Sequence, residues 1–143
     1  MKTRTILMMI AILTMLMLSA CAPNSSGEDQ LEGTSWVLTT INGERPADHT
    51  RLTIRFENGK IFGSCGRHGY SGLYLIVGDA IRLGVLNYAK TGCGQGNIWI
   101  RQDLNFIEFN FVDLLKAAER FEVADVVLTL FTDDGQTLTF ELQ

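Results

Sequence analysis

Three cysteines and two histidines carry the most reactive side chains of this 143-residue chain. Cys21 ends an apolar run, while Cys65 and Cys93 each lie among glycines. A cysteine beside a base serves as a nucleophile, two cysteines in an oxidising compartment form a disulfide, and a cysteine can also carry a lipid anchor. The elements around each cysteine decide between these chemistries.

The first twenty residues are typical of a secretory signal. Lys2 and Arg4 make a positive start, and residues 6–18 are apolar except for Thr14. This run is shorter than the roughly 20 residues that a membrane-spanning helix needs. A positive start, a short apolar run and small residues at its end predict a signal peptide over residues 1–20.

The residues before Cys21 resemble the lipobox of bacterial lipoproteins, here Leu18-Ser19-Ala20-Cys21. That resemblance implies that the signal is cut before Cys21, which is then acylated on its sulfur and on its new amine. Ordinary signal cleavage is the alternative. Two or more acyl chains hold a protein on a membrane far more firmly than one. Residues 21–30 are therefore predicted to be the lipidated cysteine and a polar, disordered tether.

The charge that remains after signal removal argues against nucleic acid as a partner. Removing Lys2 and Arg4 from the twelve basic residues leaves ten against sixteen acidic ones, a net charge near −6. Nucleic-acid binding depends on Lys and Arg contacts to phosphate. The same balance does not favour attraction to anionic lipid head groups. We therefore expect the lipid anchor alone to make the membrane contact.

Residues 31–143 are predicted to form one folded domain, because no linker interrupts them. Apolar and polar residues alternate in several short runs, as in strands that bury one face. Asn42-Gly43, Asn58-Gly59 and Asp134-Gly135 lie beside these runs and predict turns, because such pairs accept positive φ angles. The expected strands contain residues 36–38, 52–56, 60–62, 73–76, 81–83, 126–131 and 137–142.

One stretch predicts a helix, because its apolar residues recur at steps of three, four or one. We therefore expect an α+β domain, in which a curved antiparallel β-sheet carries one amphipathic α-helix packed on it. The apolar face of this helix contains Ile100, Leu104, Ile107, Phe111, Leu114, Leu115 and Ala118.

An ordered set of motifs over residues 31–143 resembles the META domain family, which includes the HslJ-like heat-shock lipoproteins. The motifs are LEGTSW at 31–36 with Asn42-Gly43, GSCGRHGYSG at 63–72, TGC at 91–93, EFNFVDLL at 108–115 and LTLFTDDGQTLTF at 128–140. The resemblance implies a META domain over residues 31–143. It also implies a role in stress response or in resistance to antibiotics of the novobiocin type.

Cys65 and Cys93 are predicted to form a disulfide. Lipidation of Cys21 leaves an even pair in an oxidising compartment, and META domains commonly carry a cysteine in each of these regions. The alternatives are a thiol hydrolase built on Cys65 and His68, and a metal site made by Cys65, His68 and Cys93. Since neither alternative has a complete set of partners in the sequence, we predict no catalytic, metal-binding or cofactor-binding residue.

These features together predict a non-enzymatic envelope lipoprotein that uses no cofactor. Ala22 stands where an Asp usually retains lipoproteins in the inner membrane, so the expected location is the outer membrane, facing the periplasm. The expected partners are the membrane, through the anchor, and an unidentified envelope protein. The alternative is a periplasmic small-molecule or lipid-binding module that uses a groove between helix and sheet.

Overall fold

The computed structural model describes residues 27–46, 51–66, 68–88, 97–102 and 105–143. The predicted signal peptide, Cys21 and Cys93 lie outside these residues. The last four residues of the predicted tether, 27–30, belong to a short helix, α2 (Gly27–Leu31). None of the helices in the described ranges has the length and apolar character needed to cross a membrane.

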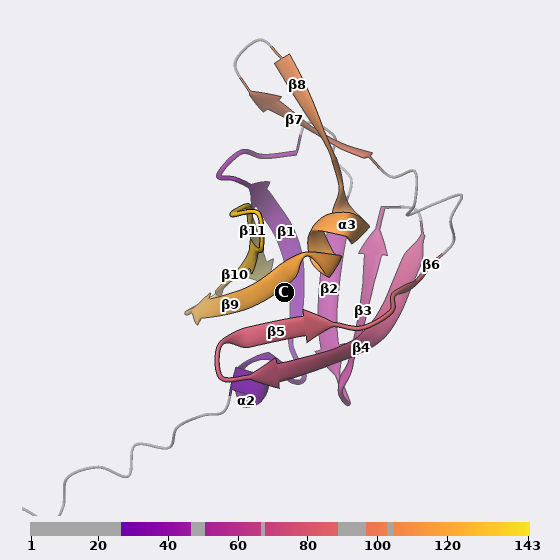
Figure 1. Cartoon of the computed structure of the whole chain (residues 1–143), viewed down its shortest axis with the longest axis vertical. Helices are drawn as coiled ribbons and strands as arrows, with labels where there is room; N and C mark the ends of the chain where they lie inside the picture. Colours follow the sequence, from indigo (N-terminus) through magenta and orange to yellow (C-terminus); the bar gives the residue numbers. More distant parts are fainter. Residues whose placement is uncertain (1–26, 47–50, 67, 89–96, 103–104) are drawn as a thin grey trace, which may run out of the picture.

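Within the described residues, eight antiparallel strands close into a barrel (Figure 1). They are β1 (Ser35–Ile41), β2 (Leu52–Glu57), β3 (Lys60–Cys65), β4 (Gly69–Val77), β5 (Ala80–Leu83), β9 (Ala118–Ala124), β10 (Val127–Thr132) and β11 (Thr137–Leu142). Neighbours follow the order β1-β2-β3-β4-β5-β9-β10-β11, and β11 pairs with β1 to close the ring. The joint between β5 and β9 is the shortest pairing of this ring, with Ala80 opposite Arg120.

The predicted fold class, an α+β domain with a curved sheet and one packed helix, is wrong. The sheet closes on itself, because β3 pairs with β4 and β5 pairs with β9. Closure removes the free edges that an open sheet would expose. The strands predicted from alternation are present, but alternation reports which face of a strand is buried and not whether the sheet is open or closed.

The stretch predicted as one long helix contains a hairpin and a helix of six residues. β7 (Asn97–Gln102) pairs with β8 (Asn105–Asn110), and α3 (Phe111–Lys116) follows directly. Leu104, one of the predicted helix positions, lies outside the described residues. The chain then enters β9 at Ala118.

Asn110 decides where α3 begins. Its side-chain oxygen accepts hydrogen bonds from the backbone nitrogens of Val112 and Asp113, at 3.0 and 3.3 Å. This N-cap satisfies backbone donors that the first helical turn leaves unpaired. The residues before Asn110 are rich in β-branched and aromatic types, which favour strands. Two short strands and a short helix, read as one segment, gave the false helical periodicity.

The predicted turns are confirmed. Asn58 and Gly59 join β2 to β3 with φ angles of 53° and 71°, and Asn42 and Gly43 follow β1 with 53° and 81°. Positive φ at both central residues is the signature of a type I′ turn. The connection between β10 and β11 is longer, and in it Gly135 has the positive φ of 83°.

Inward-facing side chains fill the barrel, and α2 and α3 lie at opposite ends of it (Figure 1). A barrel of eight strands has an interior just wide enough for such filling. Phe111 of α3 lies edge-on to Tyr70, with ring centroids 6.0 Å apart, and its ring tilts against Phe140 at 6.5 Å. The largest fully buried side chains are Trp36, Phe56, Phe111 and Phe140, followed by Leu and Ile residues of the strands and helices.

β4 differs from the other strands because it pairs with three partners. Its first half pairs with β3 on one side and with β6 (Asn87–Tyr88) on the other, and its second half pairs with β5. β5 and β6 thus pair with the same edge of β4, and residues 84–86, which join them, belong to neither strand. These residues lie beside the candidate site.

Candidate functional site: a groove on the outer face of β4

The predicted disulfide residues lie only partly within the described chain. Cys65 ends β3, its side chain is buried, and it is disulfide-bonded. Its partner lies outside the described residues, so the pairing with Cys93 stays a prediction. A cysteine in a disulfide has no thiolate, which removes the nucleophile that the thiol-hydrolase alternative requires.

His68 contacts Cys65 through its backbone carbonyl group. The carbonyl oxygen of His68 lies 3.1 Å from the Cys65 sulfur and accepts a hydrogen bond from the Cys65 nitrogen at 3.0 Å. In the part of the chain that the structure describes, no three Cys, His, Asp or Glu side chains are grouped as metal ligands would be. The third member of the metal alternative, Cys93, lies outside that part.

The predicted groove between helix and sheet is closed by packing. Phe111 occupies the space under α3, where it contacts the rings of Tyr70 and Phe140. The hydroxyl of Tyr70 donates a hydrogen bond of 2.7 Å to the carbonyl oxygen of Thr53, and burial raises the pKa of Tyr70 above its ordinary value. These aromatic residues are core, so the space that they fill is not a ligand groove.

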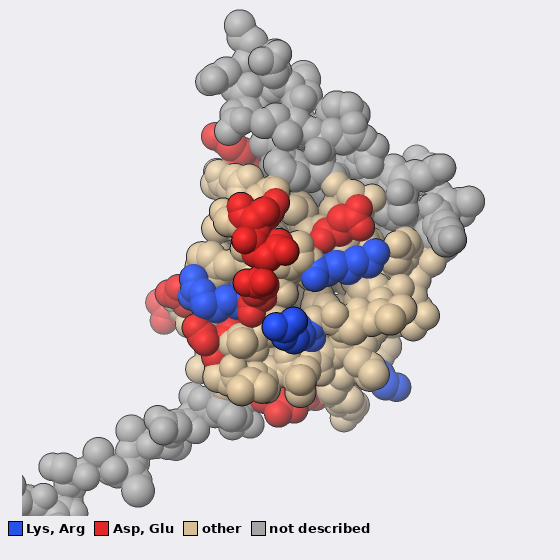
Figure 2. Space-filling model, viewed as in Figure 1, with Lys and Arg blue, Asp and Glu red and all other residues tan. Residues whose placement is uncertain are grey.

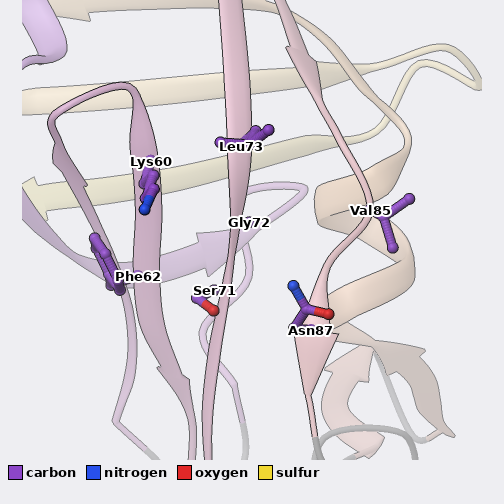
Figure 3. A pocket seen from close by; sticks show the side chains of 7 residues that line it. All are labelled: Lys60, Phe62, Ser71, Gly72, Leu73, Val85 and Asn87. Atoms are coloured by element: carbon purple, nitrogen blue, oxygen red, sulfur yellow. The ribbon is translucent and has the colours of Figure 1, made fainter.

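A groove does lie on the outside of the barrel, with a volume of about 470 Å³. Figure 3 shows that its walls come from neighbouring strands. The lining residues are Lys60 and Phe62 of β3, Ser71, Gly72 and Leu73 of β4, and Val85 and Asn87 at and before β6. The groove therefore opens to solvent beside residues 84–86, between the end of β5 and the start of β6.

Gly72 allows the segment after β5 to pack closely against β4 beside this groove. A Cβ atom at Gly72 would lie 2.6 Å from Leu86 Cδ2 and 3.1 Å from the carbonyl oxygen of Val85, so no side chain fits there. Leu86 turns into the core with 6% of its surface exposed, while Val85 stays outside with 86% exposed. Glycine lets the two backbone segments approach, and Val85 is left as one apolar wall.

The apolar surface continues along β4 beyond the groove. Leu73, Leu75 and Val77 point outward at alternate positions and are 61%, 63% and 70% exposed. We call Leu73, Leu75 and Val77 the β4 strip. Figure 2 shows a mostly uncharged surface over β4, with acidic side chains gathered over the region of α3 and β9. Contiguous exposed apolar surface on a small protein marks an interaction site.

The strands were predicted here, but their role was not. Leu73-Tyr74-Leu75-Ile76-Val77 is apolar at every position, whereas an antiparallel strand with one wet face normally alternates with polar residues. This lack of alternation was the available signal. A continuous apolar run also fits a strand buried on both faces, so the sequence alone does not assign an exposed face to β4.

A carboxylate network holds the neighbouring end of the barrel together. Tyr74 donates a 2.6 Å hydrogen bond to Glu32 Oε2, and the backbone nitrogens of Asn58 and Gly59 donate to the same carboxylate. The hydrogen bond from Tyr74, and then that from Asn58, lower the pKa of Glu32 below its ordinary value. Burial, and then the bond to Glu32, raise the pKa of Tyr74. Glu32 therefore joins the segment after α2 to β4 and the β2–β3 turn.

A smaller hollow of about 220 Å³ lies beside α3 and has a mixed charge. Its cations are Arg82 and Lys116, and Lys116 donates a hydrogen bond of 3.2 Å to the Tyr88 hydroxyl and lies 3.5 Å from Asp113. The hydrogen bond to Tyr88 is the main cause that raises the pKa of Lys116. Because this hollow is less than half the volume of the β4 groove and Lys116 is engaged internally, it is the weaker candidate.

The geometry defines a class: a small antiparallel β-barrel with a filled interior and a groove on its outer wall. The META domain profile matches residues 29–143. This protein therefore belongs to the META domain family. No curated protein matches the chain significantly.

Solved structures support the same fold. An NMR structure of a protein from Burkholderia xenovorans has a TM-score of 0.60 and 21% identity, over 87% of this chain and 94% of the other. A further NMR structure has a TM-score of 0.56 and 24% identity, over 80% and 93%. A crystal structure of a DUF4847 family protein from Bacteroides vulgatus has a TM-score of 0.52 and 13% identity, over 80% and 95%. At these identities the similarity concerns the fold.

Proposed function

We propose that this META domain protein is a non-enzymatic lipoprotein of the bacterial envelope that acts by binding at the outer face of β4. The observation that carries the proposal is the groove with its adjoining β4 strip, which is the largest hollow described above and is mainly apolar. The filled barrel interior supports an external binding surface. The disulfide at Cys65 argues against the thiol hydrolase that would use this cysteine as its nucleophile.

The anchor in this proposal is Cys21, which follows the signal over residues 1–20 and is acylated at its sulfur and amine. Ala22 directs the protein to the outer membrane, facing the periplasm. Metabolic labelling with a palmitate analogue tests the anchor: the wild-type chain should carry label and Cys21→Ser should carry none. Equal label in both would contradict it. Separation of inner and outer membranes tests the location.

A small molecule or lipid as ligand is the second candidate. The groove volume of about 470 Å³ lies within the roughly 300–1,000 Å³ of typical ligand sites. Lys60 at one end and Asn87 at the other would supply the polar contacts around an apolar body. A lipid or drug-like molecule fits this combination better than a highly charged metabolite.

Photo-crosslinking in intact cells tests binding at this face. A photoreactive residue in place of Leu73 should give adducts, whereas one in place of Thr139, on the opposite wall, should give none. The mass of the adduct distinguishes a protein partner from a small ligand. Equal crosslinking at both positions, or none at either, would contradict the proposal.

The biological setting that we propose is the envelope stress response, including resistance to antibiotics of the novobiocin type. Deletion of the gene should lower survival under heat or novobiocin, and the wild-type chain should restore it. Leu73→Glu should fail to restore survival, while Thr139→Glu should succeed. Full rescue by Leu73→Glu would show that the β4 face has no part in this role.

A further inference from the structure

The folded domain begins beside the β4 strip. Gly27, the first residue of α2, packs so closely on the β4–β5 turn that a Cβ atom there would lie 2.1 Å from the carbonyl oxygen of Gly78. The same atom would lie 3.0 Å from Ile76 Cγ2. The N-terminal end of α2 is therefore fixed next to Val77, the last member of the strip.

The chain between this point and the proposed anchor is short. Five residues, 22–26, separate Cys21 from Gly27. An extended chain spans at most about 3.6 Å per residue, so Gly27 stays within roughly 20 Å of the lipidated cysteine. Whatever its conformation, the tether keeps the β4–β5 end of the barrel close to the membrane surface.

Two cations flank the β4 strip. Lys60 lies directly opposite Leu73, and Arg82 lies opposite Leu75, and both cations are exposed. In the described part of the chain, the ion pairs are Arg55–Glu57 and Lys116–Asp113, so neither strip cation belongs to one.

Acidic groups also lie near the strip. Glu57 lies opposite Lys60 but has its carboxylate 2.8 Å from Arg55, and Asp79 lies in the turn after Val77. Figure 2 shows blue side chains on both sides of the uncharged surface over β4. Glu28 and Glu32 lie close enough to β4 to act on Tyr74, and Glu119 and Asp133 line a hollow together with Arg82. Lys60 and Arg82 are therefore cations within a surface of mixed charge.

We infer that the β4 strip rests on the bilayer in which Cys21 is anchored. Leu73, Leu75 and Val77 enter the boundary between head groups and acyl chains, and Lys60 and Arg82 contact lipid phosphates. Apolar insertion combined with cation–phosphate contact is how peripheral surfaces bind membranes. The strip is too small to bind strongly alone, but the anchor supplies a high effective concentration. The inference rests on the proposed lipid anchor and names the bilayer as the partner of the β4 face.

Quenching by brominated lipids tests this orientation. The full chain, lipidated in cells and purified, is reconstituted into vesicles of equimolar phosphatidylethanolamine and phosphatidylglycerol with bromine on the acyl chains. The variants are Leu75→Trp and, as a matched control on the far wall, Thr129→Trp, with the signal of the unmodified chain subtracted. Both positions face outward, and thermal melting verifies that each variant is folded.

We expect bromine to reduce the added fluorescence of Leu75→Trp about twofold or more and to leave that of Thr129→Trp unchanged. Combining Leu75→Trp with Lys60→Gln and Arg82→Gln should weaken the quenching in these vesicles, but not in vesicles of phosphatidylcholine. High salt should act in the same direction as the two Gln substitutions.

Equal quenching of both Trp variants, or none in either, on a palmitate-labelled chain would overturn the orientation and leave the anchor standing. Missing label on Cys21 would overturn the anchor and the orientation together. Absence of quenching combined with a protein adduct at position 73 in cells would assign the strip to a protein partner instead of the bilayer.

Discussion

β4 and β10 belong to the same barrel, yet their outward-facing side chains are covered to different extents. β10 is paired along both edges, whereas the second half of β4 is paired on one edge. On β10, Val127, Thr129 and Phe131 point outward and are partly buried. The guanidinium of Arg120 lies 3.7 Å from the centre of the Phe131 ring. Neighbouring strands therefore cover the apolar outward residues of β10.

On β4, the outward residues receive no comparable cover. Leu73, Leu75 and Val77 are more than half exposed, because pairing with β3 ends at Leu73 and the other edge has only the short strands β5 and β6. The difference shows that a barrel wall covers its own outward side chains only where both neighbouring strands are long. Where they are short, the exposed surface is available for contact outside the molecule.

The largest predicted effect concerns the core that both walls share. Phe111→Ala should lower the free energy of unfolding by about 3–5 kcal/mol, because Phe111 packs between Tyr70 of β4 and Phe140 of β11. Chemical denaturation measures this cost. Lys116→Ala, an exposed control on the same helix, should change stability by only about 0.5 kcal/mol. If the two variants were equally stable, packing of Phe111 against Tyr70 and Phe140 would not stabilise the barrel.

The joint between β3 and β4 gives the next largest effect. A Cβ atom at Gly63 would lie 2.1 Å from the carbonyl oxygen of Thr53 and 2.4 Å from the Tyr70 hydroxyl. Gly63→Ala should therefore destabilise the barrel by about 1–3 kcal/mol. Gly69→Ala is the matched control, because its nearest neighbour atom is 3.5 Å away. Equal melting temperatures for the two variants would refute this steric account.

Replacing the side chain that covers Phe131 of β10 tests the difference between the two strands directly. Arg120→Gln removes the cation from the Phe131 ring and should cost about 0.5–1 kcal/mol. It should also increase the binding of a hydrophobic dye, since β10 then exposes apolar surface as β4 does. Arg82→Gln, beside the β4 strip, should leave stability unchanged. Equal effects of Arg120→Gln and Arg82→Gln would mean that coverage by Arg120 does not explain the difference between β10 and β4.

The smallest effect is a pH dependence at the end of β4. The pKa of Glu32 is lowered in the folded state, so its stabilisation is complete above the pKa of the unfolded chain and is lost as pH falls through the folded pKa. As the pH is lowered from about 5, the free energy of unfolding should therefore fall more for the wild type than for Glu32→Gln. The difference should be small, because it reflects one exposed carboxylate. Thermal melts across this pH range measure the difference. Parallel curves would show that ionisation of Glu32 is not linked to folding.

Local sequence determined much of the secondary structure. Asn58-Gly59 has the backbone freedom for a tight turn, and the alternation around it places Leu52, Ile54 and Phe56 in the core. The ordered META motifs also predicted the family, which the match over residues 29–143 confirms. Each of these signals depends on residues that are close together in the chain.

Only the tertiary structure decided how the sheet closes and where a surface is left uncovered. Pairing of β5 with β9 joins Ala80 to Arg120 across forty residues, and no local pattern encodes that contact. The same holds for the exposed side chains of β4, whose cover depends on the length of the strands beside them. An apolar residue in the sequence indicates only a preference for burial, and the arrangement of its neighbours in space determines whether that preference is met.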